Sequence, residues 1–305
     1  MFDIITFGSA TIDIFALLKP LKEKGKICFN EGSKEVLRGL EMQTGGGGTN
    51  TAVSFANFGL KTAFCGEIGN DFFSDFLKKD LQKRKIDLSL VRVNPKTKSA
   101  VSLVLSPSNG ERVILSDFNS SMLSLKQVPL TKLKAKWFYI APLHNEATTL
   151  LKPLLSLTKK EEIKTAVNPS KEQIKTLASE TIAKIDCLIV NKEEHSLLKG
   201  KLKSFQGILT ITQGKKGCSV VSKGKQYEAE ARNIKIKEAT GAGDAFASGF
   251  ITGLFLKNDI QYGITLGLFN SESCIQEIGA KNGLLKKSQL LKMPIPIYKI
   301  KIKNI

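Results

Sequence analysis

The sequence predicts an α/β protein in which a mostly parallel central sheet is covered by helices on both faces, a three-layer α/β/α fold. From Lys136 onward, short runs rich in β-branched and aromatic residues alternate with helical patterns, as parallel sheets with crossover helices require. The chain has 305 residues and is 42% hydrophobic, which is enough to bury one large core. Because no internal repeat and no long linker is found, we predict a single domain over residues 1–305.

The first predicted strand covers residues 3–7 and ends at Gly8. In open α/β sheets, ligands bind beyond the carboxyl ends of the strands. Asp13, five residues past this strand, could therefore accept hydrogen bonds from two hydroxyls of a sugar. An aspartate in a loop is more often solvated than bound to a ligand, so Asp13 alone is weak evidence.

Four consecutive glycines, Gly45 to Gly48, precede a helix predicted over residues 51–60; we call them the glycine turn. Four glycines can form a flexible linker, but a linker would not lead straight into a packed helix. We therefore predict that the backbone of this turn approaches a polar ligand closely, with Asn50 directed into the same space.

The other elements follow from local patterns. In chain order, we expect an irregular segment over 15–44 with short strands at 26–29 and 34–37, a helix over 71–85, a hairpin of 99–105 and 111–115, strands at 137–140, 165–167, 187–190, 208–212 and 218–221, and helices near 148–160 and 171–181. The apolar face of the helix over 71–85 comprises Phe72, Phe73, Phe76, Leu77 and Leu81. Asn191 and Glu194, after the strand at 187–190, have the spacing of a capping box.

The run Ala239-Thr-Gly-Ala-Gly-Asp244 precedes a densely apolar helix that extends to Leu256. Its residues Gly241, Ala242 and Gly243, here called the anion loop, can direct free first-turn amides and the positive end of the helix dipole at one anion. Asp244 could accept a proton from a hydroxyl while these amides hold a phosphoryl group. The plain alternative is that Asp244 only caps the helix.

Taken together and in this order, these motifs resemble those of the ribokinase-like (PfkB) family of carbohydrate and nucleoside kinases. The matching pieces are Gly-Gly-x-x-x-Asn ending at Asn50, Asn-x-x-Glu at 191–194, Thr-x-Gly-x-x-Gly from Thr212, and the run ending in Asp244. The resemblance covers nearly the whole chain. It implies the ribokinase-like fold, with a small β-lid formed by residues at about 15–44 and 98–118, and a homodimer through this lid is a further expectation.

The resemblance also implies an activity: transfer of the γ-phosphoryl group of ATP to a hydroxyl of a small sugar or sugar derivative. The alternatives are a nucleoside kinase of the adenosine type and, less favoured, a non-catalytic basic protein that binds nucleotides or nucleic acid. The implied substrate contacts are Thr11, Asp13, Gly45, Gly46, Gly47 and Asn50. Asp244 is the implied base, beside the anion loop of Gly241, Ala242 and Gly243.

For the nucleotide, the resemblance implies contacts with Asn191, Thr212, Gly214 and Gly279. Glu194 is the implied Mg²⁺ residue, acting through water, because Mg²⁺ usually keeps several waters and binds few carboxylates. Glu238 stands where relatives commonly have an aspartate that helps bind a monovalent cation such as K⁺, so the ion can be retained, shifted or lost here. In this family the hairpin often ends with a Gly-Ala-Asn-like turn, which Asn119-Ser-Ser replaces.

Composition limits the kinds of partner and the location expected for this protein. The formal charge is +18, but the lysines are dispersed and no arginine cluster is present, which favours a solvated surface over a nucleic-acid role. The five cysteines are widely spaced and odd in number, as expected for buried thiols in a reducing compartment. Without a signal-peptide pattern or a long apolar run, a cytoplasmic location and no membrane partner are predicted. His144 and His195 fit no triad or metal spacing and are interpreted as structural or surface residues.

Overall fold

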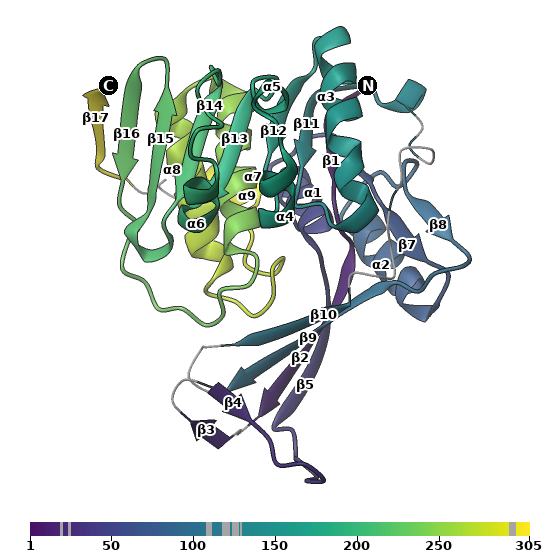
Figure 1. Ribbon diagram of the computed structural model, residues 1–305. Coiled ribbons are helices and arrows are strands. Elements are labelled where there is room, and N and C mark those ends of the chain that lie inside the picture. Colours follow the sequence, from purple (N-terminus) through teal and green to yellow (C-terminus); the bar gives the residue numbers. More distant parts are fainter. Residues whose placement is uncertain are drawn as a thin grey trace.

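The computed structural model describes residues 1–18, 21–23, 26–107, 112–117, 123, 128, 130–292 and 297–305. It consists of a large layered body and a smaller sheet that projects from it (Figure 1). The N-terminal strand β1 lies next to one edge of the large sheet, and the C-terminal strand β17 forms the opposite edge.

The body is built on a nine-stranded sheet with the order β17-β16-β15-β14-β13-β12-β11-β1-β6. The parallel part comprises β6 (Thr62–Cys65), β1 (Phe2–Phe7), β11 (Ala135–Ile140), β12 (Lys164–Val167), β13 (Cys187–Asn191) and β14 (Ile208–Thr212). The antiparallel part comprises β15 (Cys218–Ser222), β16 (Lys225–Ala229) and β17 (Ile300–Asn304). The sheet is therefore mostly parallel, as the alternating pattern predicted.

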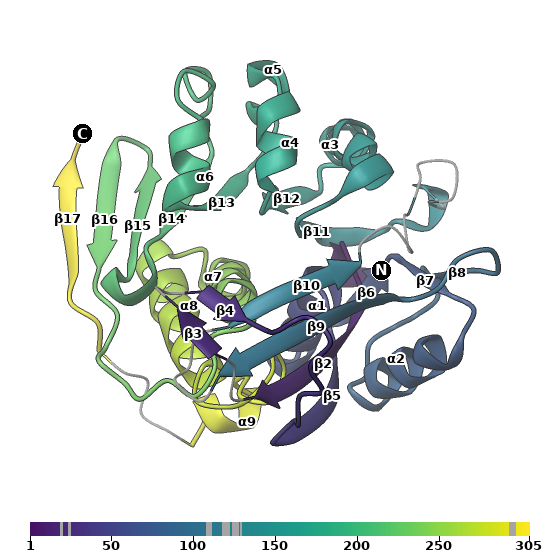
Figure 2. The ribbon, with the colours of Figure 1, turned by 60° about the horizontal axis from the view of Figure 1, so that its bottom comes forward.

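Helices cover both faces of this sheet (Figure 2). One face carries α3 (Leu151–Lys160), α4 (Lys171–Thr176), α5 (Ser179–Ile182) and α6 (Lys192–Leu197). The other face carries α1 (Gly47–Asn57), α7 (Ala242–Lys257) and α8 (Ile260–Cys274), whose apolar side chains pack with β1, β11 and β13 in a second core cluster. The remaining helices are α2 (Phe72–Lys83), α9 (Lys287–Leu290), η2 (Leu130–Lys132), η3 (Asn145–Leu150) and η4 (Gly214–Lys216). The arrangement is the three-layer α/β/α fold.

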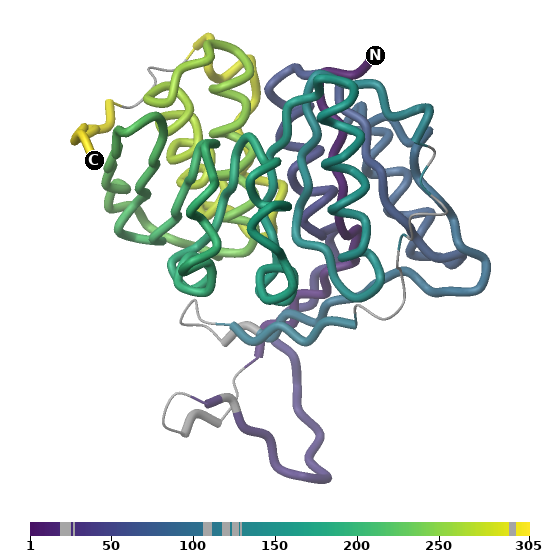
Figure 3. Tube along the Cα trace, turned by 45° about the horizontal axis from the view of Figure 1, so that its top comes forward, coloured from purple at the N-terminus to yellow at the C-terminus, as the bar shows by residue number. Residues whose placement is uncertain are grey.

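The smaller sheet, called the lid below, has the strand order β10-β9-β2-β5. Its strands are β2 (Thr11–Leu18), β5 (Gly39–Gly45), β9 (Ala100–Pro107) and β10 (Val113–Asp117). Figure 3 shows the long hairpin of β2 and β5 extending away from the body. Two further pairs are β3 (Leu21–Glu23) with β4 (Lys26–Cys28), and β7 (Glu67–Gly69) with β8 (Arg92–Asn94).

The structure corrects four local expectations. Asp13 lies within strand β2 instead of a loop, because β2 pairs with both β5 and β9 along its length. Residues 34–37 form no strand and are largely exposed. Helix α1 begins at Gly47, inside the glycine turn. Phe72 is 75% exposed, since it is the first residue of α2 and precedes the turn that packs on the body.

Two expectations fall on positions that the structure does not describe: residues 108–111 at the tip of the predicted hairpin, and the turn at Asn119-Ser-Ser. Among the described residues, no helix has both the length and the apolar character of a membrane span. All five cysteines are free, and four of them are buried. The homodimer through the lid and the cytoplasmic location stay predictions.

Candidate active site

A cleft of about 230 Å³ lies where the lid meets the body. Its walls come from the loop after β1, from the glycine turn, from the beginning of α7 and from lid strands β2, β9 and β10. The lining residues are Ser9, Thr11, Asp13, Gly46, Gly47, Asn50, Ser102, Val104, Ile114, Ser116, Pro142, His144, Thr240, Gly241 and Asp244. Sequence segments that are far apart in the chain therefore share one polar cleft.

One hydrogen bond joins the two glycine-rich segments across the body. Asn50 Nδ2 donates to Asp244 Oδ2 over 2.9 Å, although the two residues are 194 positions apart. The helices behind them are tied together in the same way, because Ser248 Oγ of α7 donates to Ser54 Oγ of α1 over 2.7 Å. The glycine turn and the anion loop therefore face the same space.

The glycine turn is held against the loop after β1 by its own backbone. The amides of Gly48 and Thr49 both donate to the carbonyl of Ser9, over 3.1 and 3.3 Å. Gly46 is the N-cap of α1 with φ of 93°, and a Cβ at this position would lie 2.5 Å from that same carbonyl oxygen. Only glycine fits both the conformation and the space.

The anion loop forms the N-terminus of the 16-residue helix α7. Gly241 is the N-cap, in the left-handed region with φ of 77°, and a Cβ there would clash with Ala280 at 2.4 Å. Within the described part of the chain, the amides of Gly241 and Gly243 have no hydrogen-bond acceptor, whereas Ala242 donates weakly to Ala239 over 3.3 Å. Free amides and the helix dipole make this loop an anion site.

Asp244 does not cap α7. It is the third residue of the helix, and its carboxylate accepts the hydrogen bond from Asn50 instead of one from the first turn. Burial raises the pKa of Asp244 above the usual range; the Asn50 hydrogen bond lowers it, the charge of Asp13 raises it and that of Lys281 lowers it. Asp244 is therefore a buried carboxylate fixed by Asn50 at the cleft, with a pKa above its usual range.

Asp13 lies on the opposite wall, in β2. Its Oδ1 accepts a hydrogen bond of 2.8 Å from Thr11, and burial raises its pKa although Thr11, Lys281 and Ser102 lower it. Gly45 does not line the cleft. Instead, a Cβ on Gly45 would lie 1.8 Å from Asp13 Oδ2, so the missing side chain makes room for this carboxylate.

Glu238 is buried directly before the anion loop. Its Oε1 accepts hydrogen bonds from the amide of Thr240 over 2.7 Å and from the Thr240 hydroxyl over 2.5 Å. Arg112, next to lid strand β10, places Nη1 3.3 Å from the same oxygen. The other oxygen, Oε2, is buried and has no hydrogen-bond partner among the described residues. Glu238 therefore already has a positive partner from the lid.

Three of the residues expected at the nucleotide, Asn191, Thr212 and Gly214, lie outside the cleft, at the edge where β13 and β14 end. Asn191 and Thr212 are register partners in these strands. Asn191 and Glu194 form the predicted capping box, with bonds of 2.8 and 2.9 Å, and Gly214 begins the 3₁₀ turn after β14. Gly279, with φ of 87°, packs against Gln43 of the lid, where a Cβ would lie 1.7 Å from Oε1.

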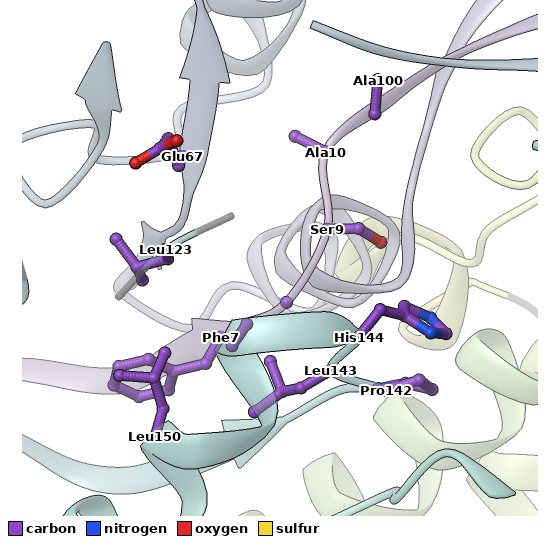
Figure 4. A pocket seen from close by; sticks show the side chains of 12 residues that line it. Phe7, Ser9, Ala10, Glu67, Ala100, Leu123, Pro142, Leu143, His144 and Leu150 are labelled. Atoms are coloured by element: carbon purple, nitrogen blue, oxygen red, sulfur yellow. The ribbon is translucent and has the colours of Figure 1, made fainter. Parts of the chain in front are cut away.

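Sequence reasoning missed several residues of this region. Ser9, His144 and Lys281 are the main ones: the first two line the cleft, and Lys281 is buried behind it. A smaller cavity of about 30 Å³, large enough for one water, adjoins the cleft at Ser9, Pro142 and His144 (Figure 4). The only sequence signal for Lys281 was its place directly after the Gly-Ala turn.

Comparison with known proteins agrees with this geometry. The model of the pfkB family of carbohydrate kinases matches residues 1–287 of the chain. The chain belongs to this family. This carbohydrate kinase is 25% identical to a ribokinase from Lactococcus lactis over 312 residues, which covers 98% of the chain and 100% of the relative.

Two solved structures show the same fold. An E. coli protein described as a ribokinase II, in complex with ATP and Mg²⁺, superimposes with a TM-score of 0.81 at 17% identity, covering 96% of the kinase and 98% of that chain. A Burkholderia thailandensis nucleoside kinase in complex with inosine superimposes with a TM-score of 0.76 at 16% identity, covering 93% and 95%. The expected family and fold are thus confirmed.

Replacing Gly45 with alanine should displace Asp13, because the added Cβ cannot lie 1.8 Å from a carboxylate oxygen. We expect kcat/KM for the phosphoryl acceptor to fall by about 100-fold, the usual size of an ångström-scale misplacement. Gly39→Ala is the matched control, because Gly39 lies in the same strand and, among the described residues, an added Cβ would meet only Leu17 Cβ, at 3.8 Å. Equal activity of the two variants in steady-state assays would contradict this role of Gly45.

Proposed function

We propose that this kinase transfers the γ-phosphoryl group of ATP to a hydroxyl of a small sugar or sugar derivative. The observation that carries the proposal is the Asn50–Asp244 hydrogen bond, which sets the base beside the glycine turn and directly after the anion loop. The three requirements of phosphoryl transfer to an alcohol are then met in one place: a held acceptor, a proton acceptor and a charge-stabilising site.

The acceptor occupies the cleft between lid and body. Asp13, Asn50 and the backbone of Gly46 and Gly47 hold its hydroxyls, with Thr11 orienting Asp13 through the 2.8 Å hydrogen bond. Asp244 takes the proton of the attacking hydroxyl. The whole chain acts as one domain, and the lid covers the cleft so that water, the competing acceptor, is kept out.

The donor lies across the anion loop from the acceptor, on the side where β13 and β14 end. Asn191, Thr212, Gly214 and Gly279 contact the nucleotide. Glu194 reaches Mg²⁺ through water; its carboxylate keeps one oxygen outside the capping box, which uses only Oε2. Bound Mg²⁺ supplies positive charge between the phosphates. The ATP and Mg²⁺ bound by the E. coli protein of the same fold support this assignment.

A nucleoside kinase is the second candidate, supported by the fold shared with the inosine-binding Burkholderia kinase. The Asp13 pair with Thr11 suits a ribose diol in either a free sugar or a nucleoside. We favour the sugar because the family model and the full-length ribokinase relative both describe carbohydrate kinases.

A substrate panel decides between these functions. ADP release with ATP and Mg²⁺ should be measured for pentoses, hexoses, sugar phosphates, sugar acids and nucleosides. We expect the largest kcat/KM with a sugar or sugar derivative. A preference for nucleosides would establish the second candidate, and no turnover combined with salt-dependent oligonucleotide binding would establish a non-catalytic protein.

The base can be tested directly. Asp244→Asn keeps the size of the side chain but removes the proton acceptor, so we expect kcat to fall by about 10²- to 10⁴-fold. ATP affinity, measured by calorimetry, should be unchanged, because the nucleotide contacts lie elsewhere. Asp259→Asn is the control at the exposed start of α8. Full activity of Asp244→Asn would remove Asp244 from this role.

We infer that the monovalent cation is not needed in this kinase. Arg112 already places its guanidinium 3.3 Å from Glu238 Oε1, and a second cation at this carboxylate would be repelled by it. Replacing K⁺ with tetramethylammonium should therefore leave the rate unchanged, and Arg112→Ala should create a dependence on K⁺. Strong activation of the wild-type enzyme by K⁺ would instead assign the ion to the unpaired Oε2.

A further inference from the structure

Lys281 is a buried cation that no part of the proposed chemistry uses. It follows the Gly279-Ala280 turn near the C-terminus and is only 3% exposed. Its Nζ donates to the hydroxyls of Thr44 and Thr49, each over 2.8 Å. These threonines flank the glycine turn, so Lys281 connects the C-terminal segment to the substrate side of the cleft.

The ammonium group has no direct ion pair within the described part of the chain. Its nearest carboxylate contact is indirect: the Thr44 hydroxyl donates to Asp80 Oδ2 over 2.5 Å. The other oxygen of Asp80 accepts a hydrogen bond of 2.8 Å from Arg84. Keeping a buried lysine charged costs solvation free energy, and burial lowers the pKa of Lys281 to about 7. The negative charges of Asp80, Asp13 and Asp244 raise this pKa, while Arg84 lowers it.

Two of these carboxylates, Asp13 and Asp244, show what the charge of Lys281 does. Asp13 and Asp244 lie on opposite walls of the cleft, burial raises the pKa of each, and the charge of Asp13 raises the pKa of Asp244 further. Among the described residues, Lys281 is the cation whose charge lowers the pKa of both Asp13 and Asp244. Without it, two carboxylates would have to be ionised together in a partly dry site.

A second connection is mechanical. The Thr49 hydroxyl, which accepts from Lys281, itself donates to the carbonyl of Gly45 over 2.6 Å. At the other end, Ala280 packs against Gly241 of the anion loop. Lys281 and its neighbour Ala280 thus link the anion loop, the glycine turn and, through Thr44 and Asp80, helix α2. We propose that Lys281 is a positioning residue of the phosphoryl transfer, which keeps Asp13 and Asp244 ionised and fixes the glycine turn relative to the anion loop.

This inference rests on the proposed function, so the experiment measures the charge of Asp244 without any turnover. The protein is labelled with ¹³C at the aspartate carboxyl groups, and Asp244→Asn assigns the resonance of Asp244. In Lys281→Met, we expect the titration midpoint of Asp244 to rise by about one pH unit, the effect of losing a nearby opposite charge. Lys299→Met removes an exposed lysine and should leave the midpoint unchanged.

Other titrating groups near Asp244 do not mimic this shift. Tyr139 and Cys274 both sense its charge, but burial raises their pKa far above the range of a carboxylate, to about 12 for Cys274. Asp13 titrates with Asp244 and should move in the same direction. Where turnover is measurable, the acid limb of the kcat/KM profile should move to higher pH by the same amount, a change that a merely structural lysine would not produce.

Lys281→Gln keeps the test decisive if Lys281→Met does not fold. Its amide can still donate to Thr44 and Thr49 but carries no charge, so the Asp244 midpoint should rise by about the same amount as in Lys281→Met. An unchanged midpoint in a folded Lys281→Met or Lys281→Gln protein overturns the inference even if sugars are phosphorylated. A shifted midpoint in a protein that phosphorylates nothing would support the charge assignment and contradict the proposed function.

Discussion

The site depends on one constraint: two helices must begin next to each other, on the same side of the sheet, so that the free amides of α7 and polar side chains of both helices face one cleft. Helices α1 and α7 meet this constraint through packing on the same sheet face and through the Ser54–Ser248 contact. Because the two helices pack in this way, Asn50 and Asp244 come within hydrogen-bonding distance at the cleft. Asn50 on α1 and Asp244 on α7 can interact only because the packing of the two helices holds them side by side.

This convergence concentrates negative charge, and the structure compensates for it locally. Asp13, Asp244 and Glu238 surround the cleft and are all at least partly buried. Different neighbours stabilise each negative charge. Thr240 and Arg112 of the lid stabilise Glu238, Thr11 stabilises Asp13, and Asn50 stabilises Asp244. Lys281, buried behind the cleft, provides a positive charge that lowers the pKa of both Asp13 and Asp244. The protein therefore uses its own side chains where an added ion could otherwise serve.

Glycines have two different roles here. Gly46 and Gly241 have backbone conformations that L-residues rarely adopt, each at the start of a helix that faces the cleft. Gly45 instead leaves room for the side chain of Asp13, and Gly279 does both, with φ of 87° and Gln43 packed against it. The sequence shows that glycines cluster, but it does not show which of these two reasons applies at each position.

Much of the fold was determined by the sequence alone, because the alternation of apolar strands and helices and the capping residues act locally. The parallel strands, the hairpin and the helix after the anion loop were predicted in the right order. Residues whose neighbours are distant in the chain were not: Asp13 was expected in a loop, Phe72 in the core, and Lys281 was overlooked. Their environments are made by strand pairing and by contacts across more than 200 residues, as between Lys281 and Thr44. The local sequence pattern thus determined which helices and strands form. Only the tertiary structure decided which charged side chains share the cleft, because their neighbours depend on how the sheet and helix layers pack.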